Sequence, residues 1–229
     1  MFHIWWGMLF VAAHFSLFLL CYRLFGRQGI FAWIGFATVI ANIQVLKTIE
    51  VLGIITTLGN TVYTTIYMAT DLLNEKYGPR QAKKAVWFGF FTLIASTIIM
   101  QLALRFDPQE TDFAQESLET IFGLLPRIAA GSLLAYAVSQ LIDVKLFTWI
   151  KSRYPHRKQL WMRTIGSTGV SQFLDTLVFC TIAFAGVYTM DVWLQILLTT
   201  YGFKLLISVV STPVLYAARR MEPKEETDT

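Results

Sequence analysis

"ATDLLNEKYGPRQAKK", Ala69–Lys84, is a polar segment between two long apolar and aromatic segments. A short polar turn of this kind is typical of a chain that leaves a membrane and enters it again. Its cations suit a cytoplasmic turn and so indicate the orientation of the neighbouring helices. The turn does not explain Asp71, Asn74 and Glu75, which share one helix face where the first apolar segment ends. These three side chains belong either to a polar helix end or to a site. The cations of the segment are Lys76, Arg80, Lys83 and Lys84.

The composition excludes a soluble globular domain. Of the 229 residues, 55% are hydrophobic and 15% are charged, whereas soluble domains have about 45–50% and about 25%. The formal net charge of +4 does not indicate nucleic-acid binding, because the cations lie between the apolar runs. The two cysteines, Cys21 and Cys180, lie inside apolar runs and show no metal-ligand or disulfide spacing.

Seven segments are apolar enough, and near enough to about 20 residues long, to cross a membrane as helices. We therefore expect an all-α fold, a polytopic integral membrane helical bundle of about seven transmembrane helices. The least regular region is 42–60, where Gly59–Thr61 marks an outer turn or a helix break. Its polar residues include Asn42, Gln44, Lys47 and Glu50. The expected spans are about 4–24, 30–46, 52–74, 85–104, 125–149, 165–186 and 192–217.

Charge alternates along the connections between these spans. Lysines and arginines follow the first, third, fifth and seventh spans, whereas the long connection after the fourth span, including residues 107–119, is acidic. Because cytoplasmic connections carry an excess of lysine and arginine, we expect the N-terminus outside and the C-terminus in the cytoplasm. Residues 219–229 are expected to form a disordered cytoplasmic tail.

Two charged residues are expected near the middle of the membrane, Asp175 in the sixth span and Lys204 in the seventh. Charged side chains at that depth are costly, so they usually face a partner or a cavity. Two interpretations stay open. The residues form a buried ion pair that holds two helices together, or they belong to a site near the midplane, where transporters bind their substrates.

Three of the expected helices carry an amide and a carboxylate three residues apart, which places both groups on one helix face. Carboxylates accept hydrogen bonds, while amides both donate and accept them. With Lys204, these pairs predict a shared polar cavity that suits a planar heterocycle with an amide edge, although the same residue types also join helices. Arg127, at the outer start of the fifth span, is either a headgroup anchor or an entrance residue. The pairs are Asp71 with Asn74, Gln140 with Asp143, and Gln172 with Asp175.

Motifs of the common enzyme classes are missing from the sequence. It has no H-E-x-x-H, no P-loop and no G-x-S-x-G. We therefore expect a protein without catalytic residues, cofactor or metal site. Without a nucleotide-binding loop, the chain cannot itself couple ATP hydrolysis to transport.

Four motifs follow one another along the chain: YMATDLLNEKYGPRQAKKAVWFGF (67–90), RIAAGSLLAYAVSQLIDVKLF (127–147), SQFLDTLVFCTIAF (171–184) and YGFKLLIS (201–208). Together they resemble the queuosine precursor transporter family, also called the vitamin uptake transporter family. The resemblance covers roughly residues 40–217. It implies a bacterial inner-membrane protein with six core helices. Such a protein imports 7-cyano-7-deazaguanine, or a related 7-deazaguanine, for queuosine synthesis in tRNA.

The resemblance also implies a domain plan and a set of site residues. Residues 1–29 are an extra N-terminal transmembrane helix with a short loop, 30–218 are the six-helix transporter core, and 219–229 are the tail. The implied partners are a small-molecule 7-deazaguanine ligand and the lipid bilayer, without direct nucleic-acid binding and with a homodimer left open. The substrate-binding residues implied by the motifs are Asp71, Asn74, Glu75, Arg127, Gln140, Asp143, Gln172, Asp175 and Lys204.

A second interpretation stays open alongside the transporter. The chain would be the substrate-binding subunit of an energy-coupling-factor type vitamin transporter, which needs a separate ATPase module. This rests on analogy between six-helix plans, which does not by itself establish function. Small residues four apart, such as Ala12 with Ser16 and Gly131 with Ala135, could pack helices against such a partner.

Overall fold

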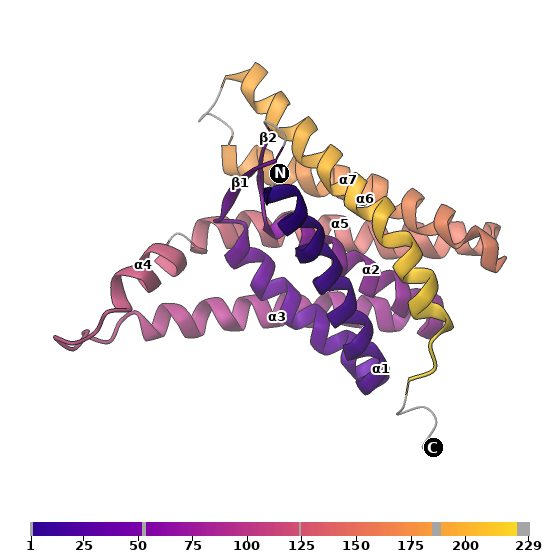
Figure 1. Ribbon diagram of the computed structural model, residues 1–229, viewed down its shortest axis with the longest axis horizontal. Coiled ribbons are helices and arrows are strands. Elements are labelled where there is room, and N and C mark those ends of the chain that lie inside the picture. Colours follow the sequence, from indigo (N-terminus) through magenta and orange to yellow (C-terminus); the bar gives the residue numbers. More distant parts are fainter. Residues whose placement is uncertain (1, 52–53, 124, 185–188, 224–229) are drawn as a thin grey trace.

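A computed structural model describes residues 2–51, 54–123, 125–184 and 189–223 of the chain (Figure 1). These ranges form a bundle of α-helices with one short 3-10 helix and a two-stranded hairpin, so the fold is helical as expected apart from the hairpin. The helices are α1 (Phe2–Gln44), α2 (Gly59–Tyr77), α3 (Pro79–Ala103), α4 (Gln115–Gly123), α5 (Leu125–Arg153), α6 (Leu160–Phe184) and α7 (Met190–Arg220). The strands are β1 (Thr48–Val51) and β2 (Ile54–Thr57), and the 3-10 helix is η1 (Arg157–Gln159).

The helix α1 folds back on itself at Gly26. The backbone of Gly26 is non-helical, with φ of 53° and ψ of −136°, a conformation that glycine adopts because it has no Cβ. Phe18 before the turn packs against Trp33 after it, with ring centroids 5.6 Å apart. Figure 1 shows the chain reversing at the lower end of α1. The two arms correspond to the expected spans at about 4–24 and 30–46.

The expected start of the third span is wrong. The sequence predicts a helix over 52–74, but the antiparallel hairpin of β1 and β2 comes first, and α2 begins at Gly59. The strands are rich in threonine, isoleucine and valine, whose branched side chains favour extended backbone. A Cβ on Gly59 would lie 2.6 Å from the carbonyl oxygen of Ala41, so any side chain would collide with the end of α1. Gly59–Thr61 is thus the first turn of a helix, neither an outer turn nor a break within a helix.

The central helix of the bundle is α2. It contacts α1, α3, α5, α6 and α7, and all its residues from Gly59 to Glu75 except Tyr63 are buried. Polar groups are tolerated at membrane depth where they are enclosed by protein. The polar residues of α2 therefore face other helices, which explains why this helix is less apolar than its neighbours.

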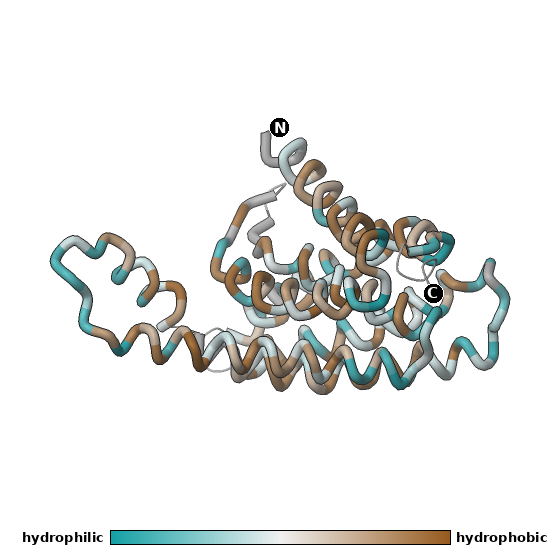
Figure 2. Tube along the Cα trace, turned by 90° about the horizontal axis from the view of Figure 1, so that it is seen from below, coloured by the Kyte–Doolittle hydropathy of each residue, from teal (hydrophilic) through white to brown (hydrophobic). Residues whose placement is uncertain are grey.

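Apolar side chains of the kind that face lipid cover the outside of the bundle. Exposed side chains along the helices include Trp87, Phe91 and Ile98 on α3 and Leu206 and Val210 on α7. Figure 2 shows the apolar residues along the helices and hydrophilic residues in the connections at both ends. Within the described ranges, five helices are long and apolar enough to cross a membrane, namely α1, α3, α5, α6 and α7. The chain is a multi-pass helical membrane protein.

The cationic connections lie together at one end of the bundle, which we call the cationic end. At the end of α2, the Lys76 ammonium donates to the Tyr22 hydroxyl of α1 over 2.6 Å and to the Met221 carbonyl after α7 over 2.8 Å. The end of α5 and the start of α6 meet Glu75 at the same place. The connection between α3 and α4 lies at the opposite end in Figures 1 and 2. The fold thus separates the connections as their charges predict.

The helix α7 ends at Arg220, so the tail boundary expected at residue 219 is too early. The Arg219 guanidinium is held by an ion pair with Glu75, at 2.7 Å, and this contact keeps the last turn of α7 on the bundle. Residues 224–229, the remainder of the expected tail, lie outside the described residues.

Candidate functional site

The face of α6 that points into the bundle is polar along most of its length. The buried polar residues recur at the three- and four-residue spacing of one helix face, while Val170 and Phe173 on the same helix are exposed. Lipid cannot hydrogen-bond polar groups, so this face depends on groups from neighbouring helices. Its residues are Arg163, Thr164, Ser167, Thr168, Ser171, Gln172, Asp175 and Thr176.

Asp175 and Lys204 form a buried ion pair. The Lys204 Nζ atom lies 2.7 Å from Asp175 Oδ2, and the other carboxylate oxygen accepts hydrogen bonds from the Tyr63 hydroxyl (3.2 Å) and the Ser139 hydroxyl (3.1 Å). One carboxylate therefore joins α2, α5, α6 and α7. The helix-joining interpretation of the pair is confirmed by these contacts, while a further role in binding stays a prediction.

An aromatic wall lies beside this ion pair. The ring centroid of Tyr63 is 5.9 Å from those of Tyr67 and Tyr136, and the ring of Phe90 is 5.1 Å from that of Tyr136. The Lys204 ammonium lies 5.2 Å from the centre of the Tyr63 ring. The wall places flat aromatic faces next to charged and amide groups, which is the combination that holds a planar polar ring.

Two further carboxyl groups of the interior are brought together by the register of α2 against α5. Hydrogen bonds join Tyr67 to Ser139 (2.9 Å) and Thr70 to Gln140 (3.3 Å), so the next inward positions bring Asp71 opposite Asp143. The two carboxyl groups are close enough for the charge of each to affect the other. We call Asp71 and Asp143 the acid pair.

Several buried polar atoms around the acid pair have no hydrogen-bond partner among the described residues. They include both carboxylate oxygens of Asp71, one oxygen of Asp143, both side-chain amide atoms of Gln172 and the amide nitrogen of Gln140. Each unpaired buried group costs about 1–3 kcal/mol, so native proteins keep few of them without a reason. The atoms include donors and acceptors and come from α2, α5 and α6, so a polar ligand could contact all three helices.

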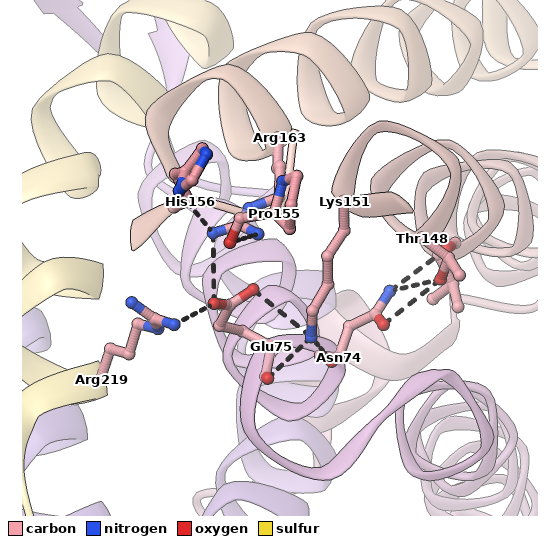
Figure 3. Close-up of polar contacts among 9 residues, drawn as sticks. Asn74, Glu75, Thr148, Lys151, Pro155, His156, Arg163 and Arg219 are labelled. Carbon is pink, nitrogen blue, oxygen red and sulfur yellow. Dashed lines mark hydrogen bonds and ion pairs between the residues drawn. The ribbon is translucent and has the colours of Figure 1, made fainter. Parts of the chain in front are cut away.

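At the cationic end, Glu75 is surrounded by three cations (Figure 3). Glu75 Oε1 lies 3.2 Å from a guanidinium nitrogen of Arg163 and 2.7 Å from one of Arg219, and Oε2 lies 3.5 Å from the Lys151 ammonium. The same ammonium donates to the carbonyls of Asn74 and Glu75, at 2.9 and 2.8 Å. The Glu75 side chain is only 1% exposed. This cluster ties α2, α5, α6 and α7 together at one end, and we call it the Glu75 cluster.

The residues predicted for the site fall into two groups. One group lines the interior next to the aromatic wall. Asn74 and Glu75 lie apart from it, since the Asn74 amide donates to the Thr148 hydroxyl over 2.9 Å and Glu75 is taken up by cations. The side chain of Arg127, in the first turn of α5, lies outside the described residues. The interior group is Asp71, Gln140, Asp143, Gln172, Asp175 and Lys204.

Sequence reasoning missed Tyr63, Ser139 and Arg163. The first two complete the shell of Asp175, and Arg163 belongs to the Glu75 cluster although its position beside a cationic connection suggested only a role in topology. The sequence did contain a sign that Arg163 is buried, because Arg163 is the first of the polar residues that recur at helical spacing along α6. Among the described residues, no three His, Cys, Asp or Glu side chains are placed to hold a metal ion.

A multi-pass bundle with a buried polar interior, lined by unpaired donors and acceptors, defines the class of helical membrane transporters. The family model described as "Putative vitamin uptake transporter" matches residues 57–218, and the chain belongs to this family. The match begins close to the start of α2, so α1 precedes the matched region.

Curated relatives agree with the family. The chain is 52% identical to the "Probable queuosine precursor transporter" of Bacillus subtilis (strain 168), over 95% of both chains. It is 30% identical to the "Queuosine precursor transporter" of Escherichia coli (strain K12), over 74% of this chain and 75% of the relative. These matches support the transporter interpretation rather than the binding-subunit alternative. No solved structure matches the chain significantly.

Proposed function

We propose that this protein imports a queuosine precursor, 7-cyano-7-deazaguanine or a related 7-deazaguanine, across the bacterial inner membrane. The observation that carries the proposal is the set of unpaired buried polar atoms of Asp71, Gln140, Asp143 and Gln172 between α2, α5 and α6. The names of the relatives support the substrate class.

The chemistry of the substrate suits this interior. A 7-deazaguanine presents a ring N–H and an exocyclic amine as donors and a carbonyl as an acceptor. The carboxyl oxygens of the acid pair accept from the donors, and the amide nitrogens of Gln140 and Gln172 donate to the carbonyl. The flat ring stacks against the aromatic wall, and Lys204 offers a further donor once its bond to Asp175 rearranges. The role of Arg127, a headgroup anchor or an entrance residue, stays a prediction.

Alanine at Gln172 is expected to weaken substrate binding by roughly fivefold, because a hydrogen bond to a neutral group contributes about 1 kcal/mol and each 1.4 kcal/mol is tenfold in affinity. The fold should survive, since no described residue pairs with the Gln172 side-chain amide. Ligand-dependent thermal shifts of the purified variant would measure the change. Gln195→Ala, on an exposed position of α7, is the matched control. Unchanged affinity in Gln172→Ala would move the site elsewhere.

The function is tested in cells that cannot make the precursor. Expression of the chain with supplied 7-cyano-7-deazaguanine should restore queuosine in tRNA, and absence of restoration by a well-expressed protein would contradict the proposal. The purified chain alone in liposomes should also transport the compound. Transport without a partner excludes an energy-coupling-factor subunit, and crosslinking of the same sample tests for a homodimer.

Seven membrane crossings are proposed, from the two arms of α1 together with α2, α3, α5, α6 and α7. In this topology the N-terminus is outside and the cationic end is cytoplasmic. A cysteine at Glu110 should react in intact cells with a membrane-impermeant maleimide, and a cysteine at His156 should react only after lysis. Both positions are exposed, and the unsubstituted protein controls for Cys21 and Cys180. The reverse labelling pattern would overturn the orientation.

A further inference from the structure

We propose that the acid pair binds one proton, carried by Asp71, and that this proton moves with the substrate. The protein would then be a proton-coupled importer. The inference rests on the proposed function, because it assigns the driving ion of that same transport. Substrate binding alone does not require the acid pair to take up or release a proton.

The geometry of the acid pair favours a shared proton. Asp71 and Asp143 are 1% and 0% exposed, and they face each other between α2 and α5. Two adjacent carboxylates in a site shielded from water repel each other strongly when both are charged, so such a pair holds one proton between them. The neutral acid then donates a hydrogen bond to the remaining carboxylate.

The surroundings of the two acids are unequal, and this decides which one holds the proton. Asp143 Oδ1 accepts a hydrogen bond from the Ser171 hydroxyl over 2.8 Å. Hydroxyl donors stabilise the charged form of a carboxyl group. Neither carboxylate oxygen of Asp71 has a hydrogen-bond partner among the described residues, so Asp143 is the carboxylate and Asp71 the acid.

Among the described residues, no cation forms an ion pair with Asp71 or Asp143. Glu75 lies one turn further along α2 and adds negative charge, while the Arg163 guanidinium adds positive charge near Asp71. The Tyr67 hydroxyl, on the preceding turn, donates to Ser139. The described buried residues of α1 and α3 are uncharged. The buried or half-buried cations of the packed helices are engaged elsewhere: Arg163 of α6, Lys151 of α5 and Arg219 of α7 with Glu75, and Lys204 of α7 with Asp175. A proton is therefore the cation that the acid pair takes.

The proton balance of one cycle follows from this assignment. A proton from outside binds Asp71, and the pair then carries a single negative charge while the neutral substrate binds. Asp71 releases the same proton to the cytoplasm as the substrate leaves. One positive charge and one substrate cross together, so an imposed difference of one pH unit supports about tenfold accumulation at zero membrane potential.

The test uses the purified full chain in proteoliposomes with radiolabelled 7-cyano-7-deazaguanine. With the outside more acidic, the unsubstituted protein should accumulate the compound up to about tenfold, and a protonophore should abolish the accumulation. Asp71→Asn imitates the protonated acid. Because asparagine cannot bind and release a proton, this variant should not accumulate the substrate in response to the pH difference. Asp191→Asn, an exposed acid in the first turn of α7, is the matched control and should accumulate normally.

Three outcomes separate the inference from the function on which it rests. Exchange without any effect of the pH difference would overturn proton coupling and leave the proposed function intact. Accumulation by Asp71→Asn at the level of the unsubstituted protein would overturn the assignment to Asp71. Absence of exchange by the unsubstituted protein would contradict the proposed function itself. If Asp71→Asn does not fold, substrate-dependent proton entry into vesicles of the unsubstituted protein decides the question, with no entry overturning the inference.

Discussion

Alanine at Lys204 is expected to abolish uptake and to destabilise the protein by about 3–5 kcal/mol, the cost of removing one partner of a buried ion pair. The Asp175 carboxylate would retain only its hydrogen bonds from the hydroxyls of Tyr63 and Ser139. Asp175→Ala should have a similar effect, because it leaves the Lys204 ammonium buried without its carboxylate. Initial uptake rates and thermal unfolding of the detergent-solubilised variants measure the two consequences.

A neutral pair separates the structural role from the functional one. Asp175→Asn combined with Lys204→Met removes both charges and keeps similar side-chain volumes, so the fold should recover much of its stability. Uptake should stay absent, because neither the carboxylate nor the ammonium is available to the substrate. If this double variant folds and transports at the normal rate, the charged pair only joins helices and the substrate binds elsewhere.

Glutamine at Glu75 is the second change with a large expected effect. The substitution preserves the shape of the side chain but leaves Arg163, Lys151 and Arg219 without their shared carboxylate (Figure 3). Arg163 is fully buried, so we expect a loss of about 3–5 kcal/mol, as for other buried pairs that lose one partner. The ends of α5, α6 and α7 should loosen together, and uptake should fall to near zero. Hydrogen exchange at the cationic end and uptake assays would measure both effects.

The control for Glu75→Gln is Lys83→Ala. Lys83 lies in the same cationic segment of the sequence but is exposed on α3, and among the described residues it takes part in no ion pair. A surface cation of this kind contributes little to stability, so the variant should transport normally. Equal and mild effects of the two changes would mean that Glu75 is an ordinary polar helix end.

Much of the fold is readable from composition along the chain. Apolar runs predicted the spanning helices, and the alternating charge of the connections predicted which of them lie together. The prediction failed at residues 54–58, because a hairpin of branched residues has the same local hydrophobicity as the start of a helix. Local hydrophobicity also cannot identify α2 as the central helix, since its polar residues reduce the apolar signal while the neighbouring helices bury them.

For the proposed site, the sequence by itself determined which residues are candidates for the chemistry. Amides and carboxylates three residues apart, and charges inside apolar runs, stand out because the membrane tolerates so few of them. Only the tertiary structure decided their partners, since pairing depends on the register of helices far apart in the chain. In that register, Glu75 of the segment Ala69–Lys84 forms ion pairs with three cations. Asp71 of the same segment lies near Asp143, and Asp175 pairs with Lys204. One short polar segment thus supplies both a cluster that fastens the helices and an acid that faces the proposed site.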